Sequence, residues 1–265
     1  MIDSHAHLYW ESFQQDFESI IDRAVESNLT HIINIGVDLE SSSQAVNQAR
    51  EVKRLKVLAT IGLHPEEFFS SLPHDYDVWI HDVCSKLEEL YNDSPDKVVA
   101  IGECGLDYYH LPSPANIEPQ KQLFKAQVEL ARKLNLPLVI HCRESWDDIF
   151  EHLDSNLTGV FHCWSGDLKA AQRALDLGFY ISFAGNLTYK NAHTLRHVAQ
   201  QIPLDRILVE TDCPFLSPEG QRGQRNEPAN VVEVAKTLAE LKGLSSAEID
   251  HQTTQNTLKL LKIKV

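Results

Sequence analysis

Short apolar runs alternate along the chain with longer segments that are apolar on one side only. Eight such runs, most of them rich in Val and Ile, cover residues 1–4, 31–36, 57–62, 98–103, 138–141, 159–162, 179–183 and 207–210. Runs that are apolar almost throughout are typical of strands buried on both faces of a parallel sheet. The pattern therefore predicts eight parallel strands.

The segments between these runs have helical periodicity. In three of them apolar residues recur every three or four positions: Phe13, Phe17, Ile20, Ile21 and Ala24; Leu123, Phe124, Val128, Ala131 and Leu134; and Val231, Val234, Ala235 and Leu238. Strand followed by helix, eight times over, favours a single (β/α)8 TIM barrel domain over residues 1–265, with a doubly wound open sheet as the alternative. Residues 245–261 predict an extra C-terminal helix, with Ser245 or Ser246 as its N-cap.

Composition and charge narrow the class of protein. The chain has 265 residues, 43% hydrophobic and 23% charged, which excludes a disordered or fibrous protein. Because there is no run of 18 apolar residues, no signal-peptide pattern and no Cys-x-x-Cys pair, we expect a cytoplasmic protein without a membrane segment or a disulfide framework, and by default a monomer. The net charge of −14 argues against a protein that coats nucleic acid, but it permits a local nucleic-acid site.

The first apolar run leads into His5-Ala6-His7. Residues i and i+2 of a strand project from the same face, so both imidazoles can reach one ion. The motif is weak by itself, because 13 histidines make such a pair common by chance, and a solvated histidine pair is the alternative.

The ends of other predicted strands strengthen the metal interpretation. Glu103, His141 and His162 end the fourth, fifth and sixth apolar runs, and Asp212 closely follows the eighth. The carboxyl ends of barrel strands converge on the rim where active sites lie. Each group has an ordinary alternative as a hydrogen-bonded cap, a salt-bridged core carboxylate or a turn residue, but all of these on one rim would be a coincidence.

Six ligands exceed the needs of one tetrahedral ion, so we expect two divalent cations, Mg, Mn or Zn, that share a bridging carboxylate. Glu103 is the expected bridge. His5, His7 and Asp212 would complete one ion, and His141 and His162 the other. Four cysteines each directly follow one of these residues and are expected to point outward as packing residues: Cys104, Cys142, Cys163 and Cys213.

At these residues the chain resembles the TatD family of metal-dependent hydrolases, within the amidohydrolase-like barrels. The matching stretches, in family order, are 2–8, 62–65 (Gly-Leu-His-Pro), 102–108 (Gly-Glu-Cys-Gly-Leu-Asp-Tyr), 137–143, 161–166, 210–214 (Glu-Thr-Asp-Cys-Pro) and 225–228. The resemblance implies a barrel, two divalent cations on the six residues named above, and removal of nucleotides from DNA, often from a 3′ end. Trp164 is a departure, since the family often has a smaller aromatic residue there.

The expected reaction is attack of a metal-activated hydroxide on a phosphodiester of a DNA strand end, with Asp212 as proton acceptor. His64 and Arg143 are expected to contact phosphate and Trp164 to stack on a base. Their alternatives are a turn or supporting histidine, an ion-pair partner and a packing residue. An esterase or amidase such as a D-aminoacyl-tRNA deacylase is the alternative function, and a non-catalytic metal-binding module is a weaker one.

Overall fold

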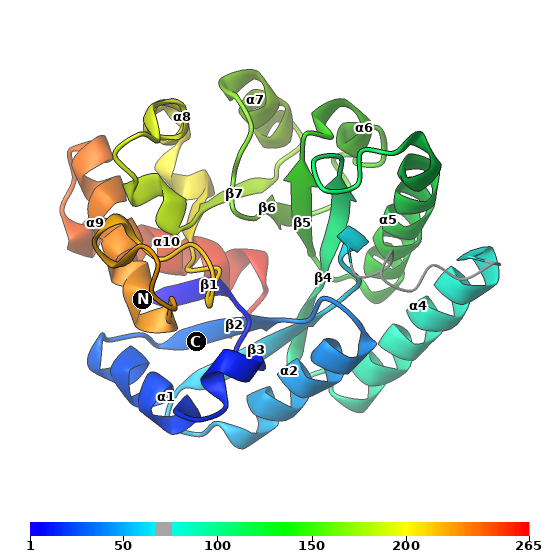
Figure 1. Ribbon diagram of the computed structural model, residues 1–265, viewed down its shortest axis with the longest axis horizontal. Coiled ribbons are helices and arrows are strands. Elements are labelled where there is room, and N and C mark those ends of the chain that lie inside the picture. Colours follow the sequence, from blue (N-terminus) through cyan, green and yellow to red (C-terminus); the bar gives the residue numbers. More distant parts are fainter. Residues whose placement is uncertain (67–75, 265) are drawn as a thin grey trace.

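Parallel strands, paired in chain order, form a nearly closed barrel (Figure 1). The structure is a computed structural model that describes residues 1–66 and 76–264. Within those residues the eight strands are β1 (Ile2–Ala6), β2 (His31–Ile35), β3 (Lys56–Ile61), β4 (Val98–Asp107), β5 (Leu138–Arg143), β6 (Gly159–Phe161), β7 (Tyr180–Phe183) and β8 (Ile207–Val209). The predicted TIM barrel is confirmed, and the open sheet is excluded.

The barrel closes where β1 meets the segment after β8. Ala6 pairs with Cys213 in an isolated parallel bridge. The backbone N–H of Asp212 donates to the His5 carbonyl at 2.9 Å, and that of His7 donates to the Cys213 carbonyl at 2.9 Å. These hydrogen bonds join the first strand of the sheet to the segment after the last strand at His5, His7 and Asp212.

Helices cover the outside of the strands (Figure 1). In the described chain they are α1 (Phe17–Glu26), α2 (Leu39–Glu51), α4 (Tyr76–Asp93), α5 (Pro114–Leu134), α6 (Trp146–Glu151), α7 (Leu168–Asp176), α8 (His193–Gln201), α9 (Val231–Lys242) and α10 (Ser246–Leu260). None of these helices is both long and apolar enough to cross a membrane. The larger apolar cluster combines their buried faces with one side of the strands.

A smaller apolar cluster involves the other side of the strands and α10. It includes alternate strand residues such as Leu58, Val139 and Leu208, together with Leu258 and Leu260 of α10. Alternate residues of a strand point to opposite faces, so these side chains belong to the inner layer of the barrel. At the opposite end of the barrel, the carboxyl ends of the strands carry polar groups instead.

The polar end of the barrel is shaped by β4, which is longer than the sequence predicted. It continues past Glu103 to Asp107 and pairs Gly105 with His141 of β5. Gly105 has φ +153°, and a Cβ built there would lie 1.8 Å from the His141 carbonyl oxygen. Only glycine permits this close approach, which places Glu103 and Asp107 beside His141.

The predicted C-terminal helix is confirmed as α10, and Ser245 is its N-cap. The Ser245 hydroxyl accepts from the Glu248 backbone N–H, while the Glu248 side chain accepts from the Ser245 N–H. At the other end of the helix, the buried Asn256 side chain donates to the carbonyls of Leu204 and Ile207 at 2.8 Å each. The helix is thus joined by hydrogen bonds to the start of β8.

We expect Ser245→Ala to lower the free energy of unfolding by about 1 kcal/mol, because the capping bond is lost. In thermal denaturation this corresponds to a fall in Tm of roughly 2–4 °C. Ser246→Ala, one position along on the same exposed turn, is the matched control and should change stability by less than about 0.5 kcal/mol. Equal Tm values for the two variants would show that the cap contributes nothing.

Candidate metal centre

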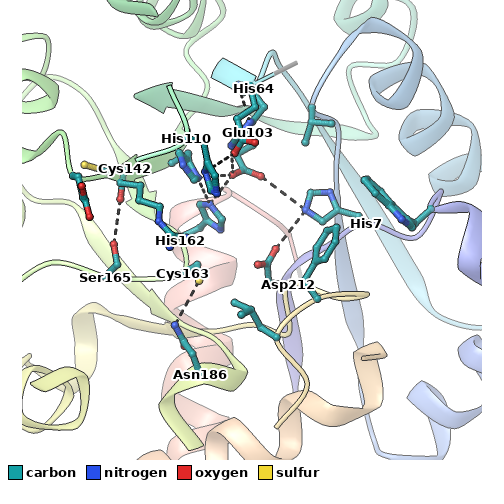
Figure 2. Close-up of a pocket in the computed structure, with 18 of the residues that line it drawn as sticks. His7, His64, Glu103, His110, Cys142, His162, Cys163, Ser165, Asn186 and Asp212 are labelled. Atoms are coloured by element: carbon teal, nitrogen blue, oxygen red, sulfur yellow. Dashed lines mark hydrogen bonds and ion pairs between the residues drawn. The ribbon is translucent and has the colours of Figure 1, made fainter. Parts of the chain in front are cut away.

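All six residues predicted as metal ligands lie together at the carboxyl ends of the strands. His5 lies in β1 and Glu103 in β4. His162 directly follows β6, and Asp212 lies three residues after the end of β8. A cavity of about 810 Å³ opens onto this group, and His5 lies beneath it with no exposed surface. Figure 2 shows His7 and His162 on either side of Glu103, with Asp212 next to His7.

The Glu103 carboxylate faces two separate groups of side chains. Its Oε2 lies 3.3 Å from His5 Nε2 and 3.9 Å from His7 Nε2. Its Oε1 lies 2.7 Å from His162 Nε2, 3.1 Å from His141 Nδ1 and 3.4 Å from His64 Nε2. One carboxylate therefore has one oxygen in each of two nitrogen-rich clusters.

Asp212 completes the first cluster. Its Oδ1 lies 3.5 Å from both His5 Nε2 and His7 Nε2. The first cluster thus contains His5, His7 and Asp212 around Glu103 Oε2. The second contains His64, His141 and His162 around Glu103 Oε1.

The donor atoms lie close together, and divalent cations would be suitable partners for them. The ring nitrogens His5 Nε2 and His7 Nε2 lie 3.3 Å apart, and the His5 and His162 rings stack with centroids 4.0 Å apart. His5 Nδ1 is buried without a hydrogen-bond partner in the described chain. Imidazole and carboxylate together are suitable ligands for divalent first-row metals. Both clusters could hold such an ion.

The electrostatics agree with that interpretation. Burial raises the pKa of the Glu103 carboxyl, but the surrounding imidazoles, His162 foremost, hold it well below its usual value. Burial likewise opposes ionisation of Asp212, and the hydrogen bond from His7 lowers the pKa of that carboxyl nonetheless. Burial and the neighbouring His141 lower the pKa of His64 to about 3. The cavity floor therefore combines ionised carboxylates with at least one neutral imidazole.

Two carboxylates that the strand-end pattern did not predict as ligands lie behind the histidines. Asp107 Oδ2 is 3.0 Å from His141 Nε2. Glu210 Oε1 is 3.4 Å from His162 Nδ1 and accepts from the Cys163 backbone N–H at 2.7 Å. Carboxylates in this position fix the orientation of a ligating imidazole. Glu210 could have been found as the last residue of the eighth apolar run, but Asp107 lies beyond the predicted end of its strand.

A third group at the mouth of the cavity consists of Glu66, Asp107 and His110. His110 Nδ1 lies 3.0 Å from Glu66 Oε1 and 2.9 Å from Asp107 Oδ2. Their oxygen and nitrogen atoms are close enough together to hold a cation, and the side chains of Glu66 and His110 are partly exposed. In the described chain this network continues through Asp107 to His141.

The expected role of Trp164 as a base-stacking surface is wrong. Its side chain is only 1% exposed, and it packs against Trp146 at 4.5 Å between ring centroids. Its Nε1–H donates to the Gly166 carbonyl at 2.8 Å. A nucleobase cannot reach a ring that is enclosed in this way, so Trp164 is a packing residue.

Arg143 and Cys163 both lie at the cavity. Arg143 is exposed, and its guanidinium lies over the Tyr109 ring, 4.3 Å from the centroid. The outward direction expected for Cys163 is wrong: the residue lines the cavity and has φ +42°, because β6 ends at Phe161 and the strand alternation no longer applies. Cys104 and Cys213 are buried, as the packing interpretation requires, whereas Cys142 is buried but also lines the cavity.

Barrel, donor set and cavity together define a class, the metal-dependent hydrolases. Comparison with known proteins places the chain within that class: residues 2–262 match the family model described as TatD related DNase. The chain belongs to this TatD family and is a TatD-family metal-dependent hydrolase.

Individual relatives match over nearly their whole length. The chain is 38% identical to the uncharacterized metal-dependent hydrolase YabD of Bacillus subtilis (strain 168), over 99% of both chains. It is 35% identical to the uncharacterized metal-dependent hydrolase YcfH of Escherichia coli (strain K12), over 99% of this chain and 96% of the relative. The crystal structure of YjjV, a TatD homologue from Escherichia coli K12, superposes with a TM-score of 0.88 at 30% identity, covering 100% of this chain and 98% of that one.

We expect metal-stripped protein to gain thermal stability when Mn²⁺ or Zn²⁺ is added. A ligand that binds only the folded state, at a hundredfold excess over its Kd, contributes about 2.7 kcal/mol per site. Glu103→Gln should lose most of this gain, since it removes the charge shared by both clusters. Glu26→Gln, on the exposed end of α1, is the control and should respond like the wild type. A wild-type Tm that does not change when metal is added would contradict the metal interpretation.

Proposed function

We propose that this hydrolase is a deoxyribonuclease that removes nucleotides from DNA strand ends in the 3′ to 5′ direction. The observation that carries the proposal is the Glu103 carboxylate with one oxygen in each of two donor clusters. Such an arrangement suits a pair of cations that act together on a phosphodiester. The match to a family of DNases supports the choice of substrate.

His5, His7 and Asp212 would hold one cation, and His141 and His162, with His64 beside them, the other, with Glu103 between the two. When bound, divalent cations lower the pKa of water and neutralise charge on phosphoryl oxygens. The protein contributes the orientation of its ligands. Asp107 and Glu210 would hold the His141 and His162 rings in place from behind.

Asp212 is the proposed proton acceptor. Asp212 lines the cavity, and its side chain is more exposed than that of Glu103, 14% against 5%. Because its pKa lies below the usual value, the carboxylate is ionised at neutral pH and can accept a proton from an attacking water. Arg143, exposed at the cavity wall, supplies a positive charge for a phosphate.

The charge of the protein limits how it can bind DNA. With a net charge of −14 the protein as a whole repels a polyanion, so binding has to be local. A cavity of about 810 Å³ is of the size of ordinary small-ligand sites. We therefore expect the enzyme to take up a strand end of one or two nucleotides and to bind long duplex DNA weakly.

The decisive assay compares substrates and metals with one preparation. Metal-stripped protein is reloaded with Mg²⁺, Mn²⁺ or Zn²⁺ and incubated with a 5′-labelled single strand, the same strand in a duplex, and an aminoacyl ester. We expect stepwise shortening of the single strand from its 3′ end.

Asp212→Asn should reduce the rate at least about 100-fold, because a general base contributes 10²–10⁴-fold. Asp96→Asn, on an exposed loop, is the matched control and should retain the wild-type rate. Equal Tm values for the two variants would show that the loss is chemical. Ester hydrolysis without shortening of DNA under any metal would replace the nuclease by a deacylase.

A further inference from the structure

Two partly exposed aromatic side chains lie at the rim of the cavity and have no role in the proposed chemistry. Trp10 is 37% exposed and Phe215 45% exposed, and both line the cavity. Their rings meet edge to face, with centroids 5.1 Å apart and an interplanar angle of 77°. Large aromatic rings that face solvent beside a polar site are typical of binding surfaces.

The backbone fixes both rings relative to the metal centre. The Trp10 N–H donates to the His7 carbonyl at 3.2 Å, and the Phe215 N–H donates to the Asp212 carbonyl at 3.0 Å. Each aromatic residue thus follows a candidate ligand by one hydrogen-bonded turn. The fully buried Asn226 holds the second turn, since its amide donates to the Phe215 carbonyl at 2.7 Å.

The rings also contact the centre directly. The His7 ring lies edge to face with both of them, at centroid distances of 6.4 Å to Trp10 and 6.2 Å to Phe215. Figure 2 shows Cys142 on the opposite side of the cavity from His7. Arg143, the next residue, also lines the cavity and carries a positive charge. The cavity therefore combines aromatic rings at its rim with one positively charged side chain and with acidic and imidazole groups.

We propose that Trp10 and Phe215 form a platform on which the base of the terminal nucleotide rests while its phosphate lies at the metal centre. The proposal rests on the deoxyribonuclease function and identifies the residues that perform the stacking expected of Trp164. A nucleobase is the favoured occupant because it is a flat π-system attached to a phosphate, and the site offers aromatic rings next to the candidate metal centre, with Arg143 in the same cavity. Stacking tolerates any sequence, since every base has a π-face.

The test is isothermal titration of metal-loaded protein with dAMP, with 2-deoxyribose 5-phosphate and with inorganic phosphate. Stacking on one aromatic side chain changes affinity about tenfold or more. The wild type should therefore bind dAMP at least about tenfold more tightly than the sugar phosphate. Trp10→Ala and Phe215→Ala should each reduce this preference severalfold, with inorganic phosphate binding and metal content unchanged, and Trp10→Phe should keep most of it.

Leu168→Ala removes an apolar side chain of similar exposure that does not line the cavity, and it should behave like the wild type. Equal binding of dAMP and sugar phosphate by the wild type, or undiminished dAMP binding by both alanine variants, would overturn the platform. The oligonucleotide assay separates the two proposals. A dAMP preference that depends on Trp10, in a protein that cleaves no oligonucleotide, would support the platform and refute the nuclease.

Discussion

The centre of this molecule depends on a buried negative charge that is shared between two clusters of imidazoles. Removing an ionised carboxylate from water is costly unless charged and hydrogen-bonding partners compensate for it. Glu103 is 4% exposed, and histidines from β1, β5 and the segments after β1, β3 and β6 surround its two oxygens. The histidines alone are crowded, nitrogen against nitrogen, whereas divalent cations would satisfy the carboxylate and the imidazoles together.

Barrel closure brings the two halves of this centre together. His5 lies in the first strand, His7 directly follows it, and Asp212 lies in the segment after the last strand, so they are neighbours because β1 pairs with the segment after β8. The same junction contains Asp3, whose carboxylate accepts from the Thr211 backbone N–H at 2.9 Å and from its hydroxyl at 2.6 Å. The hydrogen bonds that close the barrel between β1 and the segment after β8 therefore also set the geometry of the first donor cluster.

Under the proposed function, the cavity would allow an acidic protein to act on an acidic polymer. Apart from His5, the histidines of the two clusters line the cavity together with Arg143, Glu103 and Asp212, whereas the net charge of −14 is that of the whole chain. At physiological ionic strength the repulsion between exposed charges is screened within about 8 Å, whereas contacts inside a partly enclosed cavity are screened much less. Under the proposed function, short-range groups would therefore hold a strand end although the protein repels the rest of the polymer.

The sequence by itself predicted the strand order, the extra helix and the residues of the two donor clusters except His64. Strand periodicity is local, and the convergence of parallel strand ends is a property of every such barrel.

Tertiary structure alone decided which neighbours enclose a side chain after its strand has ended. Trp164 is buried because Trp146 and Phe161 pack on it, Cys163 turns into the cavity because β6 is short, and His64 meets Glu103 because β3 and β4 are adjacent. Beyond the last paired residue of a strand, the direction and burial of a side chain depend on packing between distant segments. No local sequence pattern encodes that packing.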